Sequence, residues 1–301
     1  MVVQHNLTAM NSQRMLGITT GQQAKSTEKL SSGYKINRAA DDAAGLSISE
    51  KMRRQIRGLT QASANASDGI SCVQTAEGAL NEVQDMLQRM NELAVKGENG
   101  TLTSTDRGYI AAEVSQLMSE IDRVRETTTF NEKSLLDGSF SAVDLQVGAE
   151  TNTNNKIQVK ITSMGTSSLA SSVSITSDKY GFATKAKLVS TFKTYGGKAA
   201  ANRTEITASK FGDLNVWAKQ AIKDVSMQRS DLGAIQNRLE HTIANLDNVV
   251  ENTTAAESQI RDTDMASEMV KFSNNNILAQ AGQAMLAQAN QSNQGVLSLL
   301  G

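Results

Sequence analysis

Three stretches of the chain place apolar side chains at alternating steps of three and four residues, and this spacing constrains the fold more than any other feature. The stretches cover residues 76–94, 110–124 and 232–260. Such a heptad pattern forms one apolar stripe along a helix, which must be buried against other helices. The 301 residues include no proline, so nothing interrupts long helices. The pattern predicts a mainly α fold built as a long antiparallel helical bundle or coiled coil.

The connections between these stretches predict a smaller β part. A polar, turn-rich segment at 97–106 joins two of the expected helices into an antiparallel hairpin. Apolar and polar residues then alternate in three short stretches, 143–147, 157–161 and 173–175. Alternation of this kind is typical of strands, so we expect a small β-hairpin region. Residues 179–212 have weak periodicity and are interpreted as a short variable insert.

The two ends of the chain are nearly uncharged and form amphipathic patterns. Residues 272–301 contain no Asp, Glu, Lys or Arg, and Arg14 is the only full charge between residues 1 and 24. The apolar positions expected to mediate assembly are Leu7, Met10, Ile277, Leu278, Met285, Val296 and Leu300. A single helix of this composition is marginal in water. We therefore expect the terminal helices to pair and to fold only on association with other copies of the chain.

A cluster of charges lies between each terminal helix and the rest of the chain. The clusters consist of Arg38, Asp41, Asp42, Arg261, Asp262 and Asp264. An acidic residue suits a helix N-terminus, so Asp42 is expected to cap the helix that follows. We interpret both clusters as a joint, with Arg38 paired to Asp262 as one hypothesis. A catalytic carboxylate pair is less favoured, because no third group or metal ligand lies near in the sequence.

These features predict three parts of the chain. They are a terminal helical domain of 1–42 with 262–301, a bundle domain of 43–178 with 213–261, and the insert at 179–212. The formal net charge of −1 implies no general attraction to nucleic acid or to anionic membranes. No segment is long and apolar enough to span a bilayer.

The residues that could carry out chemistry are few. His5 and His241 are the only histidines, and neither the HExxH motif nor a phosphate-binding glycine loop occurs. Cys72 is the only cysteine, and we expect it to be a small buried apolar group rather than a reactive thiol. The sequence predicts a structural protein rather than an enzyme, with no cofactor and no metal.

Both ends of the chain resemble bacterial flagellin, the subunit of the flagellar filament. The N-terminal block KLSSGYKINRAADDAAGLSISEKMRRQIRGL (29–59), with residues 66–95, is similar to one signature of that family, and residues 229–291 are similar to the other. The resemblance implies terminal helices in an inner tube, a helical layer with a β-hairpin around them, and a variable outer insert.

The resemblance also implies a location and partners. The chain would be exported unfolded without a cleaved signal and would polymerise outside the cell into a filament for motility. An export chaperone would hold residues 265–301, and filament cap and junction proteins would contact the polymer. A hook–filament junction protein, which shares the terminal helices, is the alternative.

A host receptor is a further implied partner. In this family, Toll-like receptor 5 recognises a segment that matches residues 88–95 and 111–117, and Arg89, Leu93 and Glu113 match its main contact positions. Leu93 lies beside the heptad stripe, where an exposed leucine could act as an anchor. From the residues alone, Arg89 and Glu113 could equally be a solvated pair across the hairpin or contacts between subunits.

Overall fold

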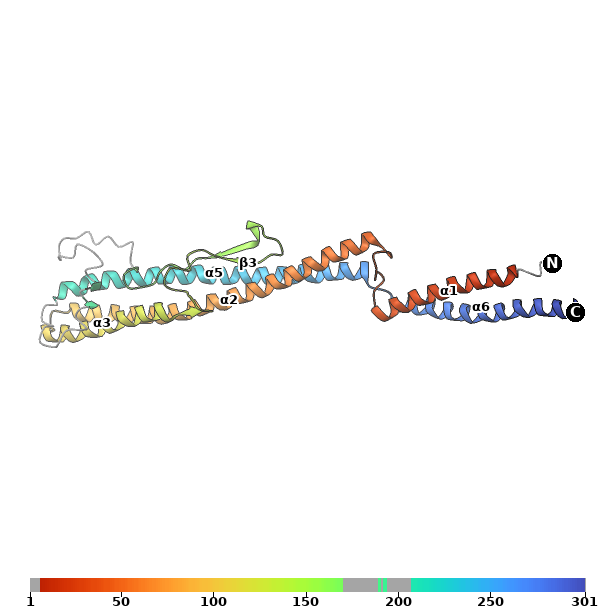
Figure 1. Ribbon diagram of the computed structural model, residues 1–301. Helices are drawn as coiled ribbons and strands as arrows, with labels where there is room; N and C mark the ends of the chain where they lie inside the picture. The colour runs from red at the N-terminus through yellow and green to blue at the C-terminus, as the bar shows by residue number, and fades with distance from the viewer. Residues whose placement is uncertain (1–5, 170–188, 191, 194–206, 301) are drawn as a thin grey trace. The chain divides into compact units, whose positions relative to one another are not determined.

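The computed structural model describes residues 6–169, 189, 190, 192, 193 and 207–300, without the side chains of 292–300. The described chain is mainly helical, as the heptad pattern predicts (Figure 1). The helices are α1 (Leu7–Ser32), α2 (Ala43–Glu98), α3 (Ser104–Thr127), α5 (Ala208–Arg261) and α6 (Met265–Leu300).

The chain divides into two compact units. The terminal unit comprises Met1–Arg57 with Val249–Gly301, and the central unit comprises Gly58–Asn248. Both boundaries between the units fall inside the long helices α2 and α5 rather than in a loop.

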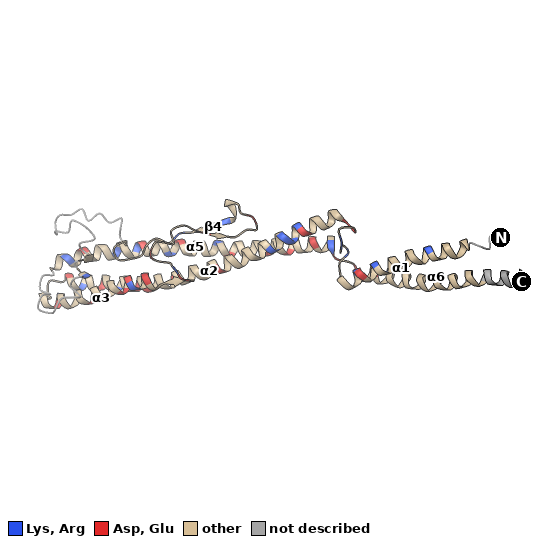
Figure 2. Ribbon diagram, viewed as in Figure 1, with Lys and Arg blue, Asp and Glu red and all other residues tan. Residues whose placement is uncertain are grey.

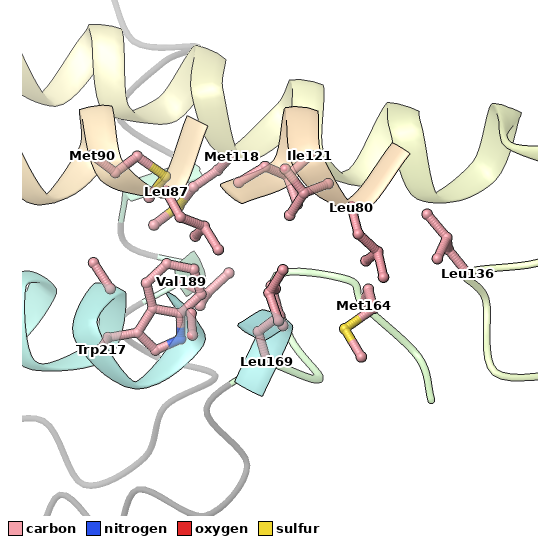
Figure 3. Close-up of a cluster of buried hydrophobic side chains, with 14 of the residues drawn as sticks. Leu80, Leu87, Met90, Met118, Ile121, Leu136, Met164, Leu169, Val189 and Trp217 are labelled. Carbon is pink, nitrogen blue, oxygen red and sulfur yellow. The ribbon is translucent and has the colours of Figure 1, made fainter. Parts of the chain in front are cut away.

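The core of the central unit is formed where α2, α3 and α5 pack together. The α2 residues of the predicted stripe are each no more than 1 % exposed, and they are Ala76, Leu80, Val83, Leu87, Met90 and Ala94. In Figure 3, side chains from α2 and α3 converge with Trp217 of α5 and with Met164 and Leu169, which follow the last strand. Cys72 is buried at the edge of this core, and burial raises the pKa of its thiol.

The turn between α2 and α3 is stabilised by a capping box. The backbone N–H of Asp106 donates to the hydroxyl of Thr103, and the Asp106 carboxylate accepts from the backbone N–H of Thr103 at 3.1 Å. This reciprocal arrangement satisfies two backbone donors that the start of a helix would otherwise leave unpaired. The antiparallel hairpin predicted around residues 97–106 is therefore present.

Two short antiparallel hairpins follow α3. They are formed by β1 (Thr129–Phe130) with β2 (Lys133–Ser134), and by β3 (Val143–Gln146) with β4 (Lys156–Val159), which follows the 3-10 turn η1 (Thr153–Asn155). Asn131 and Glu132 have φ angles of 48° and 64°, as a two-residue hairpin turn requires. Two of the three predicted strands are confirmed, and the third, 173–175, lies outside the described residues.

The expected insert at 179–212 is described only in part. Val189 and Phe192 are buried in the central core, and the Phe192 ring contacts that of Phe211 edge-on, with the ring centroids 5.7 Å apart. Helix α5 begins at Ala208, slightly before the expected return of helix near Asp213.

In the terminal unit, α1 and α6 lie side by side and antiparallel, confirming the predicted pairing of the terminal helices (Figure 1). At the start of α1, the side chain of Asn6 accepts from the N–H of Ala9 and donates to the carbonyl of Ala289 at 3.0 Å. At its other end, Gly33 adopts φ 75° and its N–H donates to the carbonyl of Lys29. Glycine reaches this left-handed conformation without steric strain, so it is a suitable residue to end the helix.

Candidate assembly surface and joint

The paired terminal helices leave many large apolar side chains exposed. Ten of them on the described parts of α1 and α6 are at least 48 % exposed, and we call these ten the assembly surface. They are Leu7, Met10, Met15, Ile18, Met265, Met269, Val270, Ile277, Leu278 and Met285. Large exposed apolar patches are uncommon in monomeric proteins, so these ten residues are the candidate contact surface of the terminal unit.

Five of the seven residues expected to mediate assembly belong to this surface. They are Leu7, Met10, Ile277, Leu278 and Met285. The other two, Val296 and Leu300, lie in α6 beyond the described side chains. Periodicity at the ends pointed to these positions but did not identify the additional methionines.

The residues of α1 and α6 that are fully buried are small or polar. The buried residues within the described parts of these helices are Ser26, Glu268, Ala279 and Ala289. An alanine contributes little apolar area. The larger apolar side chains of the two helices that are not exposed are only partly buried, and they are Leu16, Leu30, Phe272 and Leu286. Their polar faces consist largely of amides and hydroxyls, and Figure 2 shows few charges on α1 and α6 outside the part near the turn.

Glu268 is the one charged residue buried at the α1–α6 contact in the described chain. The Ser26 hydroxyl, which hydrogen-bonds to it, lowers the pKa of this carboxyl, and desolvation opposes that effect. Lys271 donates to the carboxylate at 3.2 Å and also lowers the pKa. The contact between Ser26 of α1 and Glu268 of α6 favours one register of the two helices, because any shift along the axis separates the carboxylate from this hydroxyl, while Lys271 moves with α6.

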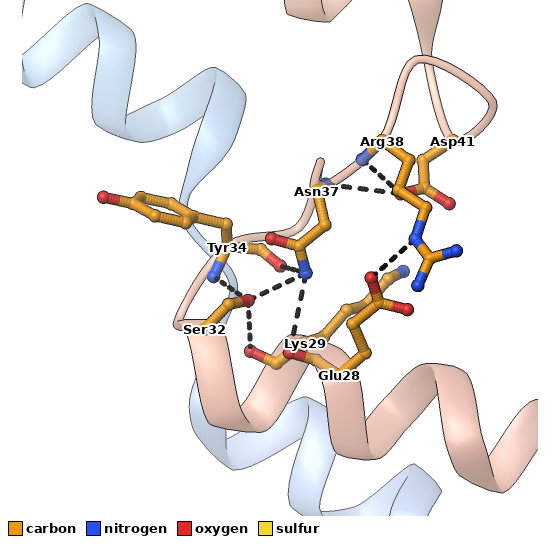
Figure 4. Close-up of polar contacts among 7 residues, drawn as sticks. All are labelled: Glu28, Lys29, Ser32, Tyr34, Asn37, Arg38 and Asp41. Carbon is orange, nitrogen blue, oxygen red and sulfur yellow. Dashed lines mark hydrogen bonds and ion pairs between the residues drawn. The ribbon is translucent and has the colours of Figure 1, made fainter.

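The turn between α1 and α2 forms one half of the joint (Figure 4). Arg38 donates to Glu28 at 2.9 Å, so its guanidinium reaches back to α1. The Asp41 carboxylate accepts from the backbone N–H groups of Arg38 and Asn37, at 3.0 and 3.3 Å. The first of these bonds is the main cause of the lowered pKa of Asp41. Asp42 caps α2, as expected, by accepting from the N–H of Gly45 at 2.9 Å.

Backbone hydrogen bonds join this turn to the segment between α5 and α6. The N–H of Lys35 donates to the carbonyl of Arg261 at 2.7 Å, and the N–H of Thr263 donates to the carbonyl of Gly33 at 3.0 Å. These two bonds form an isolated antiparallel bridge between Tyr34 and Asp262. The two charged segments therefore meet, through main-chain atoms.

The hypothesis of an Arg38–Asp262 ion pair is wrong. Arg38 is paired with Glu28 instead, and Asp262 accepts from the hydroxyl of Ser258 at 2.6 Å. The cation that links the segments is Arg261, which donates to Glu50 of α2 at 2.9 Å and lies 4.7 Å from the centre of the Tyr34 ring.

Asp264 belongs to the start of α6. It accepts from the hydroxyl of Ser267 and from the N–H groups of Ala266 and Ser267, and these bonds lower its pKa. Of the residues that build the joint, Glu28, Tyr34 and Glu50 were missed by sequence reasoning, since they lie outside the two charged clusters.

The third group of predicted residues lies on the α2–α3 hairpin. Arg89 donates to Glu113 at 2.9 Å and to Glu92 at 3.1 Å, and the Glu113 bond is the main cause of the raised Arg89 pKa. The ion pair across the hairpin is therefore present. The expectation that Leu93 is exposed is wrong: the side chain is 2 % exposed and belongs to the central core.

Metal-binding clusters and membrane-spanning helices are not found among the described residues. Within the described ranges, no three His, Cys, Asp or Glu side chains gather in a way that could hold a metal ion. No helix in the described part of the chain combines the length and the apolar character that a membrane crossing needs.

The sequence was compared with protein families and with individual known proteins. Residues 3–141 match the bacterial flagellin N-terminal helical region, and residues 217–300 match the bacterial flagellin C-terminal helical region. The chain is 50 % identical to flagellin from Halalkalibacterium halodurans over 300 residues. It is 47 % identical to flagellin from Bacillus subtilis over 312 residues. It is 46 % identical over 310 residues to the flagellar filament 31.3 kDa core protein of Treponema maltophilum. Each alignment covers 100 % of both chains.

Proposed function

This chain belongs to the bacterial flagellin family, and from this premise we propose that its terminal helices fold fully only when copies polymerise into the extracellular flagellar filament. Proteins of this family are structural subunits of the flagellar filament, which serves motility. The observation that carries the proposal is the assembly surface, which leaves large apolar side chains uncovered while α1 and α6 bury mainly small residues against each other.

Association with other copies would complete the burial that the single chain lacks. Fully burying a Leu, Ile or Met side chain contributes about 1.5–3 kcal/mol. The low charge of α1 and α6 supports contacts between copies, because few ionic groups would have to be desolvated when neighbours pack around them. The same exposed surface would suit an export chaperone that binds residues 265–301 before assembly, and contacts with filament cap and junction proteins.

Removing residues 272–301 tests the proposal. We expect the truncated chain to form no filaments in negative-stain electron microscopy, since it lacks Ile277, Leu278 and Met285. The central core should stay folded, and the emission of the single buried tryptophan, Trp217, reports this directly. Filaments of normal appearance from the truncated chain would contradict the proposed role of α6.

A pair of single substitutions gives a sharper test. Ile277→Lys places a charge in the assembly surface, whereas Met227→Lys places one at a similarly exposed position on α5. The first should raise the critical concentration for polymerisation, and the second should have a smaller effect.

A hook–filament junction protein is the second candidate, because such a protein would use similar terminal helices. The two candidates differ in what the purified full-length chain does alone. Growth of long filaments from this chain supports the filament subunit, while short or absent polymers under the same conditions support the junction protein.

We also propose that Toll-like receptor 5 binds the α2–α3 hairpin through Arg89 and Glu113. Support comes from their match to the family's contact positions and from the exposure of both side chains. Arg89→Ala should lower the response of receptor-expressing reporter cells. Arg123→Ala, which removes a comparable exposed pair with Glu120, is the matched control and should leave the response unchanged.

A further inference from the structure

Methionine is unusually frequent in the assembly surface. Five of its ten residues are methionines, out of twelve in the whole chain. They are Met10, Met15, Met265, Met269 and Met285, all between 48 and 63 % exposed. The core of the central unit, in contrast, buries Met90, Met118 and Met164 almost completely. These eight methionines therefore form an accessible group on the terminal helices and a protected group in the core.

The methionine thioether can be oxidised, so exposed and buried methionines should differ in their reactivity toward peroxide. A hydroperoxide transfers one oxygen atom to the sulfur: the S–O bond forms, the O–O bond breaks, and water leaves when the oxidant is hydrogen peroxide. The sulfoxide is polar, and methionine sulfoxide reductases can restore the thioether. Exposed methionines react with peroxide in solution, whereas buried ones are shielded.

We propose that these five methionines form a peroxide-sensitive modification site, whose oxidation in the unassembled chain prevents polymerisation and whose reduction restores it. This proposal rests on the proposed assembly of copies through α1 and α6. The sulfoxide oxygen is a hydrogen-bond acceptor, so it needs a hydrogen-bond donor when it is buried against apolar neighbours. Without one, each sulfoxide should raise the critical concentration by about tenfold or more.

In this proposal the five methionines react with peroxide only before assembly. Once neighbouring copies cover α1 and α6, the five thioethers are shielded like those of the core. Met227 of α5 is 56 % exposed but lies outside the assembly surface, so it serves as an internal reference for peroxide reactivity.

The experiment compares hydrogen peroxide treatment of the unassembled full-length chain and of preformed filaments. Peptide mass spectrometry should find the five methionines oxidised in the unassembled chain and protected in filaments. The oxidised chain should show a critical concentration at least tenfold higher, and reductase treatment should reverse this. Equal oxidation of the five residues in both samples, or an unchanged critical concentration after their full oxidation, would overturn the proposal.

Two variants identify the methionines that matter. A variant with all five replaced by leucine should polymerise and should keep doing so after peroxide, while Met227→Leu should stay as sensitive as the original chain. Loss of assembly by the peroxide-treated leucine variant, when it assembles untreated, would refute the site. If the leucine variant does not assemble at all, the oxidised original chain tests the proposal instead. Reductase treatment should then restore its critical concentration, and a failure to restore it would refute the site. Failure of the untreated original chain to polymerise would instead refute the proposed function.

Discussion

Replacing Gly17 and Gly21 with alanine should stabilise α1 in the unassembled chain. Both glycines lie at exposed positions in the middle of α1, and a Cβ atom added at either one would meet no atom within 4 Å beyond the neighbouring residues and backbone of its own helix. Glycine in a helix interior is less favourable than alanine by about 1 kcal/mol, because more backbone entropy is lost on folding. Two substitutions should therefore favour the helix by about 2 kcal/mol, which is roughly thirtyfold in the ratio of helical to unfolded α1.

Hydrogen exchange followed by mass spectrometry measures this ratio. The chain is kept below its polymerisation concentration, and protection of the α1 amides should rise by up to about thirtyfold in the double variant. Peptides of the central core should show no change and give an internal reference.

Gly33→Ala is the matched control, because Gly33 ends the same helix at φ 75°. Alanine is strained in this conformation, so the substitution should reduce α1 protection instead of raising it. Unchanged protection in the Gly17 and Gly21 double variant would refute the view that α1 is only marginally stable before assembly.

Two further substitutions test the packing of each unit. Gly97→Ala should destabilise the central core by about 1–3 kcal/mol, because the added Cβ would lie 2.5 Å from ring atoms of the buried Phe211. Gly78→Ala, at an open position of the same helix, should be neutral or stabilising, and urea unfolding monitored by tryptophan fluorescence compares the two. In the terminal unit, the Glu268 carboxyl has a folded pKa lowered from its ordinary 4.5, mainly by the Ser26 hydroxyl. Its contribution to stability is therefore complete above that ordinary value and lost as the pH falls through the lower folded value. Hydrogen exchange of α6 should accordingly depend less on pH below 4.5 in Glu268→Gln than in the original chain.

The buried side of each bundle helix could be predicted closely from heptad spacing, but its width could not. The spacing identified one stripe on α2, and every member of that stripe from Ala76 to Ala94 is buried. Leu93, beside the stripe, is buried as well, because α2 packs against both α3 and α5 rather than against one partner. A helix with two partners buries a broader face than a two-helix seam requires. The number of partners is a property of the tertiary fold, which local spacing does not encode.

The joint shows a second limit of sequence reasoning. Charge clusters at residues 38–42 and 261–264 correctly marked the place where two segments meet, and the capping role of Asp42 followed from local rules. The choice of ion-pair partner did not follow. The backbone path after Gly33 brings Arg38 back over Glu28, while Arg261 finds Glu50 and the Tyr34 ring. Long cationic side chains reach several acceptors, so only the folded path selects among them.

The contrast between the two units explains why the terminal helices are built from weak contacts. A pair of helices that buried its own large side chains would be stable alone. It would then have little exposed apolar area left to bury against a neighbouring copy. Because α1 and α6 fully bury Ala279 and Ala289 but expose residues such as Ile277 and Met285, the exposed apolar area would be available for the proposed association. Glu268 and Ser26 set the register of the pair without adding apolar area. Substitutions that strengthen the α1–α6 contact by moving large apolar residues into it should therefore weaken the coupling between folding and assembly, even as they stabilise the single chain.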